Sequence, residues 1–369
     1  TALVFGRERV GLTNEELARI DEICSIPANA DYPVLNLGQA ATITLYELRS
    51  LTFDDETQDL YYSHRVNTYG VAIEDISDPN ATDWTGYACW FNETDYTWKF
   101  NWTWWDAQTQ ENVKNGANGF RVRCPLGFSD DPERWTDERW YNGTLNYYRE
   151  VNAHFVEKGW EDEAYFYDID EPQYHLPQGV TLKQYFDELA PVLRDIKQVA
   201  PDLKIAITYP PTKDAQAAFP YIDIWIPLNS QFDTAAIKER QAAGDEIWYY
   251  TCVQPVAPYP NVMFFNHLFE SRLLAWQVYV HDIDGFLFWR SWSYRHYGYG
   301  VGFNGMGDGV LLYEDQAGNP VESIRWEMLL QGQEDYEYLW LFDQLCQEYE
   351  SQGRTDEISE LKSHVEGKL

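Results

Sequence analysis

The stretch Ala164-Tyr165-Phe166-Tyr167-Asp168-Ile169-Asp170-Glu171-Pro172 indicates the fold class of this chain. Its first six residues are mainly apolar or aromatic and predict a buried strand. Pro172 has no backbone N–H for a neighbouring strand, so we expect strand pairing to end at Glu171. The carboxylates of Asp170 and Glu171 therefore follow the carboxyl end of a buried strand, where α/β enzymes carry their catalytic groups.

This acidic pair has to be weighed against chance, because the chain contains 60 Asp and Glu among its 369 residues. Most adjacent acidic pairs in such a chain are solvated surface residues, as we expect for Asp54-Asp55 and Asp130-Asp131. Asp170-Glu171 differs because an apolar strand leads directly into it. We treat it as the candidate site and keep a solvated surface pair as the alternative.

Strands and helices are predicted to alternate along most of the chain. The predicted strands are 120–124, 164–170, 203–209, 222–227, 246–252 and 285–290. The predicted helices are 145–158, 181–199, 234–243, 267–279 and 323–348. Repeated strand-then-helix units predict a parallel sheet, and seven or eight units fit an α/β fold of the (β/α)8 barrel type. The active site of such a barrel lies at the carboxyl ends of its strands.

The two regions before this alternation are predicted separately. We expect an N-terminal extension, 1–40, that packs on a catalytic barrel, 41–369, whose first strand is 41–47. Capping-box spacing at Thr13-Asn14-Glu15-Glu16 predicts a short helix in the extension. An aromatic-rich insertion near 80–117 has no helical period. Its rings form either the core of a packed hairpin or a wall on which sugar rings stack.

Net charge and sequons indicate the setting of the protein. The charge of −33 argues against nucleic acid or an anionic membrane as a partner. No apolar run approaches the length of a membrane span. The acidic excess fits either a high-salt environment or an ordinary acidic secreted enzyme. Four Asn-x-Ser/Thr sequons favour an exported glycoprotein, outside the cell or on its surface: Asn80, Asn92, Asn101 and Asn142.

The cysteine pattern gives no metal site. The five cysteines show no C-x-x-C spacing and the histidines no H-x-x-H spacing, so we do not expect zinc. The odd count leaves at least one thiol unpaired within the chain. If a disulfide forms, Cys89–Cys124 is the pairing that we expect.

Aromatic residues stand at several predicted strand ends, where they would surround the acidic pair: Tyr209, Trp225, Tyr249, Tyr250, Trp289 and Trp292. Any one of them could be a core residue, but several together predict a carbohydrate pocket. Asp168 shares a strand face with Asp170. It either supports Asp170 or is a buried structural acid paired with Arg121 or Arg123.

Several further runs accompany the Asp-Glu-Pro segment: IWYY at 247–250, YPN at 259–261, ESRLLAW at 270–276, DGFLFW at 284–289, GDG at 307–309, LY at 312–313, SIR at 323–325, Gly332 and DYEYL at 335–339. In these runs the chain resembles glycoside hydrolase family 123, the β-N-acetylgalactosaminidases. The resemblance covers roughly residues 45–345 and is strong after Glu163. Family members usually carry an N-terminal β-sandwich, which about forty residues here cannot supply.

The resemblance implies a retaining hydrolase that removes terminal β-linked N-acetylgalactosamine from glycans without a metal or organic cofactor. Most retaining glycosidases hold two carboxylates about 5 Å apart across the scissile bond. Because adjacent side chains on an extended segment diverge, substrate assistance by the 2-acetamido group fits Asp170-Glu171 better. Glu171 would be the general acid and then the base, and Asp170 would hold the acetamido N–H. Tyr209 would orient the acetamido carbonyl, and the remaining pocket residues would be Asp168, Trp225, Tyr250, Trp289 and Trp292.

Three alternatives stay open. The first is a β-N-acetylglucosaminidase of the same mechanism, because the two sugars differ only in configuration at C4. The second is a glycan-binding barrel without catalysis. The third is a hydrolase with a direct carboxylate nucleophile, which requires a second essential acid on a distant strand.

Overall fold

The computed structural model describes residues 57–67, 73–128, 132–231, 234–291, 306–315 and 320–367. It divides into two units, Thr1–Asp59 with Glu314–Glu322, and Leu60–Tyr313 with Ser323–Leu369. The second unit holds the sheet, the site and nearly all described elements. The predicted extension 1–40, its helix, the predicted strand 41–47 and Trp292 lie outside the described residues.

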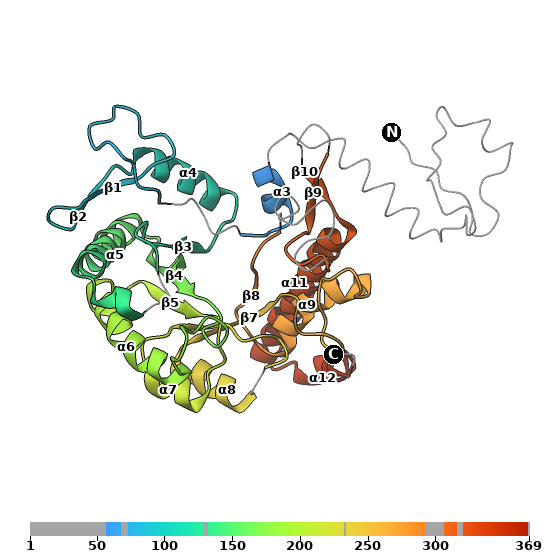
Figure 1. The fold of residues 1–369 in the computed structure, drawn as a ribbon. Coiled ribbons are helices and arrows are strands. Elements are labelled where there is room, and N and C mark those ends of the chain that lie inside the picture. Colours follow the sequence, from blue (N-terminus) through green and yellow to red (C-terminus); the bar gives the residue numbers. More distant parts are fainter. Residues whose placement is uncertain are drawn as a thin grey trace, which may run out of the picture. The chain divides into compact units, whose positions relative to one another are not determined.

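The second unit is built on a curled sheet of parallel strands (Figure 1). The strands pair in sequence order: β3 (Phe120–Val122), β4 (Ala164–Ile169), β5 (Lys204–Ile207), β6 (Ile224–Trp225), β7 (Glu246–Thr251) and β8 (Gly285–Phe288). Each connection returns to the next strand in the same direction, and such crossovers are right-handed. Helices therefore line the outer face of the sheet, and the inner face curls around a concave interior.

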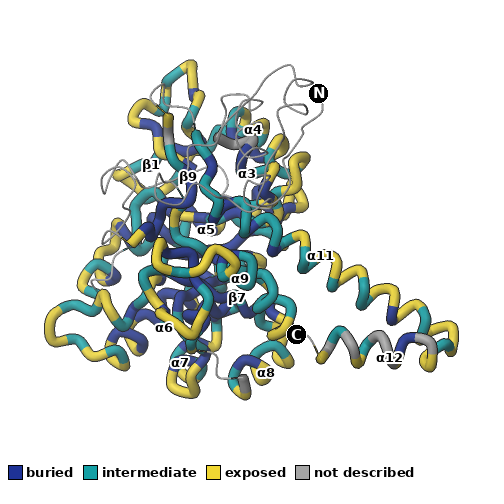
Figure 2. The backbone as a smooth tube through the Cα atoms, turned by 90° about the vertical axis from the view of Figure 1, so that its right-hand side faces the viewer, coloured by how far each residue is buried: buried dark blue, intermediate teal, exposed yellow. Residues whose placement is uncertain are grey.

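The helices between the strands are α5 (Glu138–Lys158), α6 (Leu182–Val199), α7 (Lys213–Ala218), α8 (Thr234–Ala243) and α9 (Leu268–Val280). The long α11 (Ile324–Ser351) and α12 (Thr355–Glu366) follow β8. Local sequence explains several ends. Asp137 caps α5 by accepting hydrogen bonds from Arg139 and Trp140, and Thr181 forms a capping box with Gln184 at the start of α6. Figure 2 shows the strands buried at the centre and the second half of α11 largely exposed.

The shorter elements are α3 (Thr57–Ser63), β9 (Leu312–Glu314), β10 (Pro320–Glu322) and the 3-10 turns η1 (Pro132–Thr136) and η2 (Glu161–Glu163). None of the described helices combines the length and the apolar character that a bilayer crossing requires.

The predicted fold class is confirmed as a mixed α/β fold with a curled parallel sheet, which forms a half-barrel. Among the described residues this sheet has six strands, so the eight-stranded barrel is not reached in that part of the chain. The observed strands are shorter than predicted. β5 ends at Ile207, for example, because the chain turns at Thr208 and Tyr209.

The aromatic insertion forms a packed hairpin. The antiparallel strands β1 (Cys89–Asn92) and β2 (Thr97–Phe100) precede α4 (Thr103–Lys114), and the Trp98 indole donates a hydrogen bond of 2.8 Å to the Gly143 carbonyl of α5. The Trp102 ring stacks at 4.6 Å on Phe100 and at 4.0 Å on His154. Two near-parallel rings this close must cover opposite faces of Trp102. The hairpin-core alternative therefore describes this ring, and no face of it is left for a sugar.

The expected Cys89–Cys124 disulfide is wrong, because both cysteines are free and buried. The Cys89 thiol points to the Glu74 carbonyl oxygen, 3.5 Å away. Burial raises the pKa of the Cys124 thiol to about 12, so this group is a neutral core residue.

Candidate active site

The acidic pair lies where β4 ends, at the carboxyl edge of the sheet. Glu171 has a φ of +40°, in the left-handed region that non-glycine residues rarely adopt. Pro172 follows directly and prevents continued strand pairing. This turn sends the two adjacent side chains to different partners, as their hydrogen bonds show.

One hydroxyl connects both acids. The Thr208 Oγ1 atom accepts a hydrogen bond of 2.7 Å from the Glu171 backbone N–H and donates one of 2.8 Å to Asp170 Oδ1. The Tyr167 hydroxyl donates a second bond, of 2.9 Å, to the same oxygen. Thr208 is buried directly after β5. Tyr167 belongs to the concave core, the cluster of buried side chains inside the curled sheet that consists of Tyr165, Tyr167, Ala206, Ile224, Ile226, Leu228, Tyr250 and Leu287. Asp170 Oδ1 is therefore held by two hydroxyl donors.

Glu171 is bound by Tyr250 of β7. The Tyr250 hydroxyl donates a hydrogen bond to Glu171 Oε1. Burial, followed by the hydrogen bond and charge of Glu171, raises the pKa of Tyr250, so the phenol stays protonated and remains a donor. The neighbouring Cys252 thiol has a pKa raised to about 12, mainly by burial and in part by the charge of Glu171. Tyr250 and Cys252 are therefore neutral groups beside Glu171.

A third carboxylate, Asp308, lies close to this pair. It is 2% exposed. Its Oδ1 atom accepts a hydrogen bond of 2.8 Å from the Trp289 indole, and its Oδ2 atom accepts one of 3.1 Å from the Val253 backbone N–H. Burial raises the pKa of Asp308, and the charge of Glu171 raises it further. The Gly-Asp-Gly run was the only sequence signal for this residue, and such a run is equally typical of a turn.

Asp168, near the end of β4, forms ion pairs with two arginines. Its side chain is 5% exposed and contacts the Arg121 guanidinium at 2.5 Å and Arg123 Nε at 3.5 Å. Burial raises the pKa of Asp168 although both arginines oppose this shift. The contacts match the structural alternative, in which Asp168 pairs with arginine.

Two of the predicted aromatic residues contact acids of the site. Tyr250 contacts Glu171, and Trp289 contacts Asp308, so both lie at the site. Tyr209 follows β5 at the same edge and packs edge-to-face on Phe186, with ring centroids 5.5 Å apart. Burial raises the pKa of its half-buried hydroxyl.

Trp225 is not part of the pocket, and its predicted role is wrong. Ile224 and Ile226 belong to the concave core, so the side chain between them points to the opposite face of the sheet. Trp225 is 1% exposed, and its indole donates a hydrogen bond of 2.7 Å to Asp245. It packs between the sheet and the outer layer, where no sugar reaches it.

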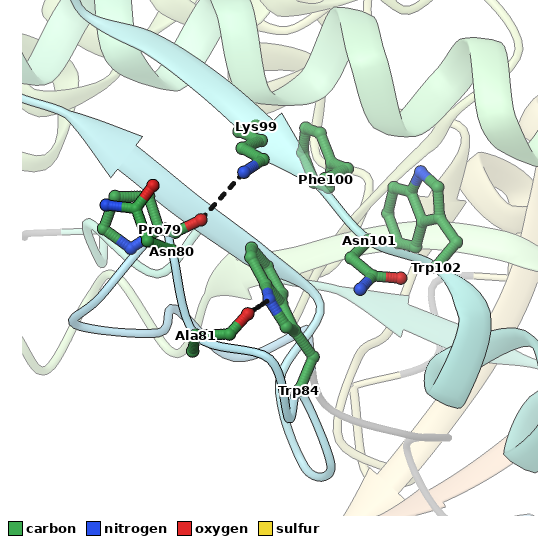
Figure 3. A pocket seen from close by; sticks show the side chains of 8 residues that line it. All are labelled: Pro79, Asn80, Ala81, Trp84, Lys99, Phe100, Asn101 and Trp102. Atoms are coloured by element: carbon green, nitrogen blue, oxygen red, sulfur yellow. Dashed lines mark hydrogen bonds between the residues drawn. The ribbon is translucent and has the colours of Figure 1, made fainter.

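A separate hollow lies beside the hairpin (Figure 3). Lys99 donates a hydrogen bond of 2.8 Å to the Pro79 carbonyl, and the Trp84 indole donates one of 3.0 Å to Ala81. These bonds close the loop around the hollow. Its rings are buried or already stacked, so we assign it no ligand.

Comparison with known families assigns the region that carries this site to a family. Residues 130–342, more than half of the chain, match the glycoside hydrolase 123 catalytic domain. The chain belongs to glycoside hydrolase family 123. A solved family 123 hydrolase from Clostridium perfringens aligns with a TM-score of 0.46 and 17% identity over 64% of this chain and 45% of that one. A glucosidase from Croceicoccus marinus aligns with a TM-score of 0.41 and 19% identity over 74% and 62% of the two chains.

The N-terminal region of this family 123 chain matches a second family. Residues 1–46 match the SpoU rRNA methylase family. An uncharacterized tRNA/rRNA methyltransferase LasT from Serratia marcescens is 44% identical over 92 residues, which are 22% of this chain and 47% of that protein. The tRNA (cytidine-2'-O-)-methyltransferase TrmJ from Sulfolobus acidocaldarius is 62% identical over 47 residues, or 13% and 20%. The chain thus spans less than half of these relatives and of the Clostridium hydrolase.

Proposed function

We propose that this glycoside hydrolase removes terminal β-linked N-acetylgalactosamine from glycans with participation of the 2-acetamido group. The observation that carries the proposal is the division of partners at the acidic pair. Asp170 Oδ1 accepts hydrogen bonds from the Tyr167 and Thr208 hydroxyls. Glu171 receives one donor on Oε1, which leaves Oε2 to hold and transfer a proton.

The reaction then proceeds in two steps. The acetamido oxygen attacks the anomeric carbon while the bond from that carbon to the leaving oxygen breaks, and Glu171 gives its proton to the leaving oxygen. Asp170 accepts a hydrogen bond from the acetamido N–H and stabilises the positive charge of the cyclised intermediate. In the second step the Glu171 carboxylate takes a proton from water, and the water oxygen attacks the anomeric carbon. The bond from that carbon to the acetamido oxygen breaks, which restores the acetamido group. Configuration at the anomeric carbon is retained.

A direct carboxylate nucleophile is the second mechanism to weigh, since Asp308 is a further acid on a distant segment. Its two oxygens, however, accept hydrogen bonds from Trp289 and Val253, and it is almost fully buried. A nucleophile needs an oxygen that can reach the anomeric carbon. Asp308 suits a supporting role better.

The test is Glu171→Gln, measured with aryl β-N-acetylgalactosaminides of good and poor leaving groups. Removing the acid should lower kcat/KM for the poor leaving group by about 10²- to 10⁴-fold and affect kcat/KM for a dinitrophenyl leaving group much less. Glu163→Gln, at the opposite end of β4, is the matched control and should leave both rates unchanged. An E171Q variant that turns over both substrates at the native rates would remove Glu171 as the acid.

A further inference from the structure

Asp308 joins the ends of two neighbouring strands. Val253 follows β7 and Trp289 follows β8, and the pairing of Thr251 with Phe288 brings these two ends side by side. One Asp308 oxygen binds the Val253 N–H and the other binds the Trp289 indole. A single carboxylate therefore fixes one main-chain segment and one aromatic side chain at the edge that carries Glu171.

The loop that bears Asp308 is itself held from α11. Arg325, in the first turn of that helix, donates hydrogen bonds to the carbonyl oxygens of Gly307, at 3.3 Å, and of Val310. A third bond, of 2.5 Å, goes to the Val262 carbonyl. Arg325 is buried, so the loop on both sides of Asp308 is anchored by a charged group that water does not reach.

We propose that Asp308 is a positioning residue that holds the Trp289 indole as a fixed wall for the sugar ring, an inference that rests on the proposed function. The hydrogen bond is made at the edge of the indole, so the bond itself covers neither face of the ring. The Arg290 guanidinium lies over one face, 5.4 Å from the ring centroid. A sugar bound at Glu171 would pack on the other face.

Ionised Asp308 is well suited to this role. A charged acceptor gives a stronger hydrogen bond than a neutral one, and the carboxylate offers one oxygen to the Trp289 indole and the other to the Val253 N–H. Asparagine would offer one oxygen and would turn an amide N–H toward the other donor. The Asp308→Asn variant therefore keeps the volume of the side chain and breaks one of the two bonds.

The first experiment measures hydrogen exchange at the Trp289 indole by NMR, with the resonance assigned by its absence in Trp289→Phe. Loss of the anchor in D308A and, at unchanged volume, in D308N should accelerate exchange at Trp289 by about tenfold or more. Asp245→Ala is the matched control, because it removes the acceptor of the buried Trp225 indole on the other face of the sheet. It should accelerate exchange at Trp225 and leave Trp289 unchanged. Unchanged exchange at Trp289 in both Asp308 variants would overturn the proposal.

The second experiment is a double-mutant cycle in kcat/KM with an aryl β-N-acetylgalactosaminide. Asp308→Ala and Trp289→Phe should each lower kcat/KM about tenfold, and the double variant should lose little more than the worse single variant. Independent losses that multiply would show that Asp308 does not act through Trp289 and would overturn the proposal. A native enzyme that cleaves no glycoside would contradict the proposed function, whereas the exchange rates would still decide whether Asp308 anchors Trp289.

Discussion

Glu171 combines a specialised backbone with a specialised side-chain contact. A non-glycine residue with a φ of +40° stores about 1–3 kcal/mol, so the surroundings must hold it in place. The Thr208 hydroxyl holds its N–H, and the Tyr250 hydroxyl holds its carboxylate. The position of the proposed acid is therefore fixed by groups from β7 and from the end of β5, and not by β4 alone.

The Tyr250→Phe variant should lower kcat about tenfold with little change in stability, because it deletes the hydrogen bond that holds the proposed acid, worth about 0.5–1.5 kcal/mol. Steady-state kinetics with an aryl glycoside would measure this loss. Tyr249→Phe is the matched control, since the Tyr249 hydroxyl points to the other face of β7 and binds the Leu274 carbonyl. That variant should lose stability and keep kcat. Equal kcat in Y250F and Y249F would contradict the role of Tyr250.

At the scale of elements, α9 and α11 pack along each other and hold the end of the sheet. Gly332 of α11 lies against the Arg272 carbonyl oxygen of α9, where an added Cβ would clash with backbone. Asp335, one turn further on, accepts hydrogen bonds from Arg272, at 2.8 Å, and from the Trp276 indole, also at 2.8 Å. The close approach and the polar bonds together fix the start of α11, which carries Arg325.

Gly332→Ala should lower the free energy of unfolding by about 1–3 kcal/mol, although alanine has the higher helix propensity by about 1 kcal/mol. The clash with backbone prevails because neither helix can move away without breaking the bonds of Asp335. Urea denaturation would measure the change. Glu334→Ala, at an exposed position of the same helix, should be close to neutral. A G332A protein as stable as the native one would show that the two helices separate easily.

The sequence predicts elements better than it predicts the partners of side chains. The helix at 234–243 has its predicted bounds, and the apolar run before Asp170 forms β4. Trp225 was misplaced because a two-residue strand gives too short a period to show which face is buried. Thr208 was missed because a threonine after a strand carries no signal of its own. Only the neighbouring strand brings it to Asp170.

At the scale of the whole molecule, net charge and the carboxyl groups with shifted pKa values determine how stability changes with pH. The chain carries −33, and burial raises the pKa of Asp168 and Asp308 above the unfolded value of about 3.9. A carboxyl group with a raised folded pKa contributes stability that is complete below the unfolded pKa and is lost as pH rises through the folded pKa. Asp195 and Asp335 have lowered pKa values, mainly through hydrogen bonds from Arg194 and Arg272. Their contribution to folding stability is lost only when the pH falls below ~4.

The melting temperature in low salt should therefore be higher at pH 5 than at pH 8, because deprotonation and self-repulsion both increase with pH. Sodium chloride at about 1 M screens the repulsion and should raise the melting temperature at pH 8 more than at pH 5. Differential scanning calorimetry at the two pH values, with and without salt, would measure both effects. A melting temperature that is higher at pH 8 and insensitive to salt would contradict this account.

The most direct test of the central claim compares initial rates of hydrolysis of aryl β-glycosides of N-acetylgalactosamine, N-acetylglucosamine and galactose, with one leaving group throughout. Participation of the acetamido group at Asp170-Glu171 predicts cleavage of the N-acetylgalactosaminide and none of the galactoside, which lacks the internal nucleophile. Cleavage of the N-acetylglucosaminide at an equal rate would preserve the mechanism and change the substrate. Cleavage of the galactoside at a comparable rate would contradict substrate assistance.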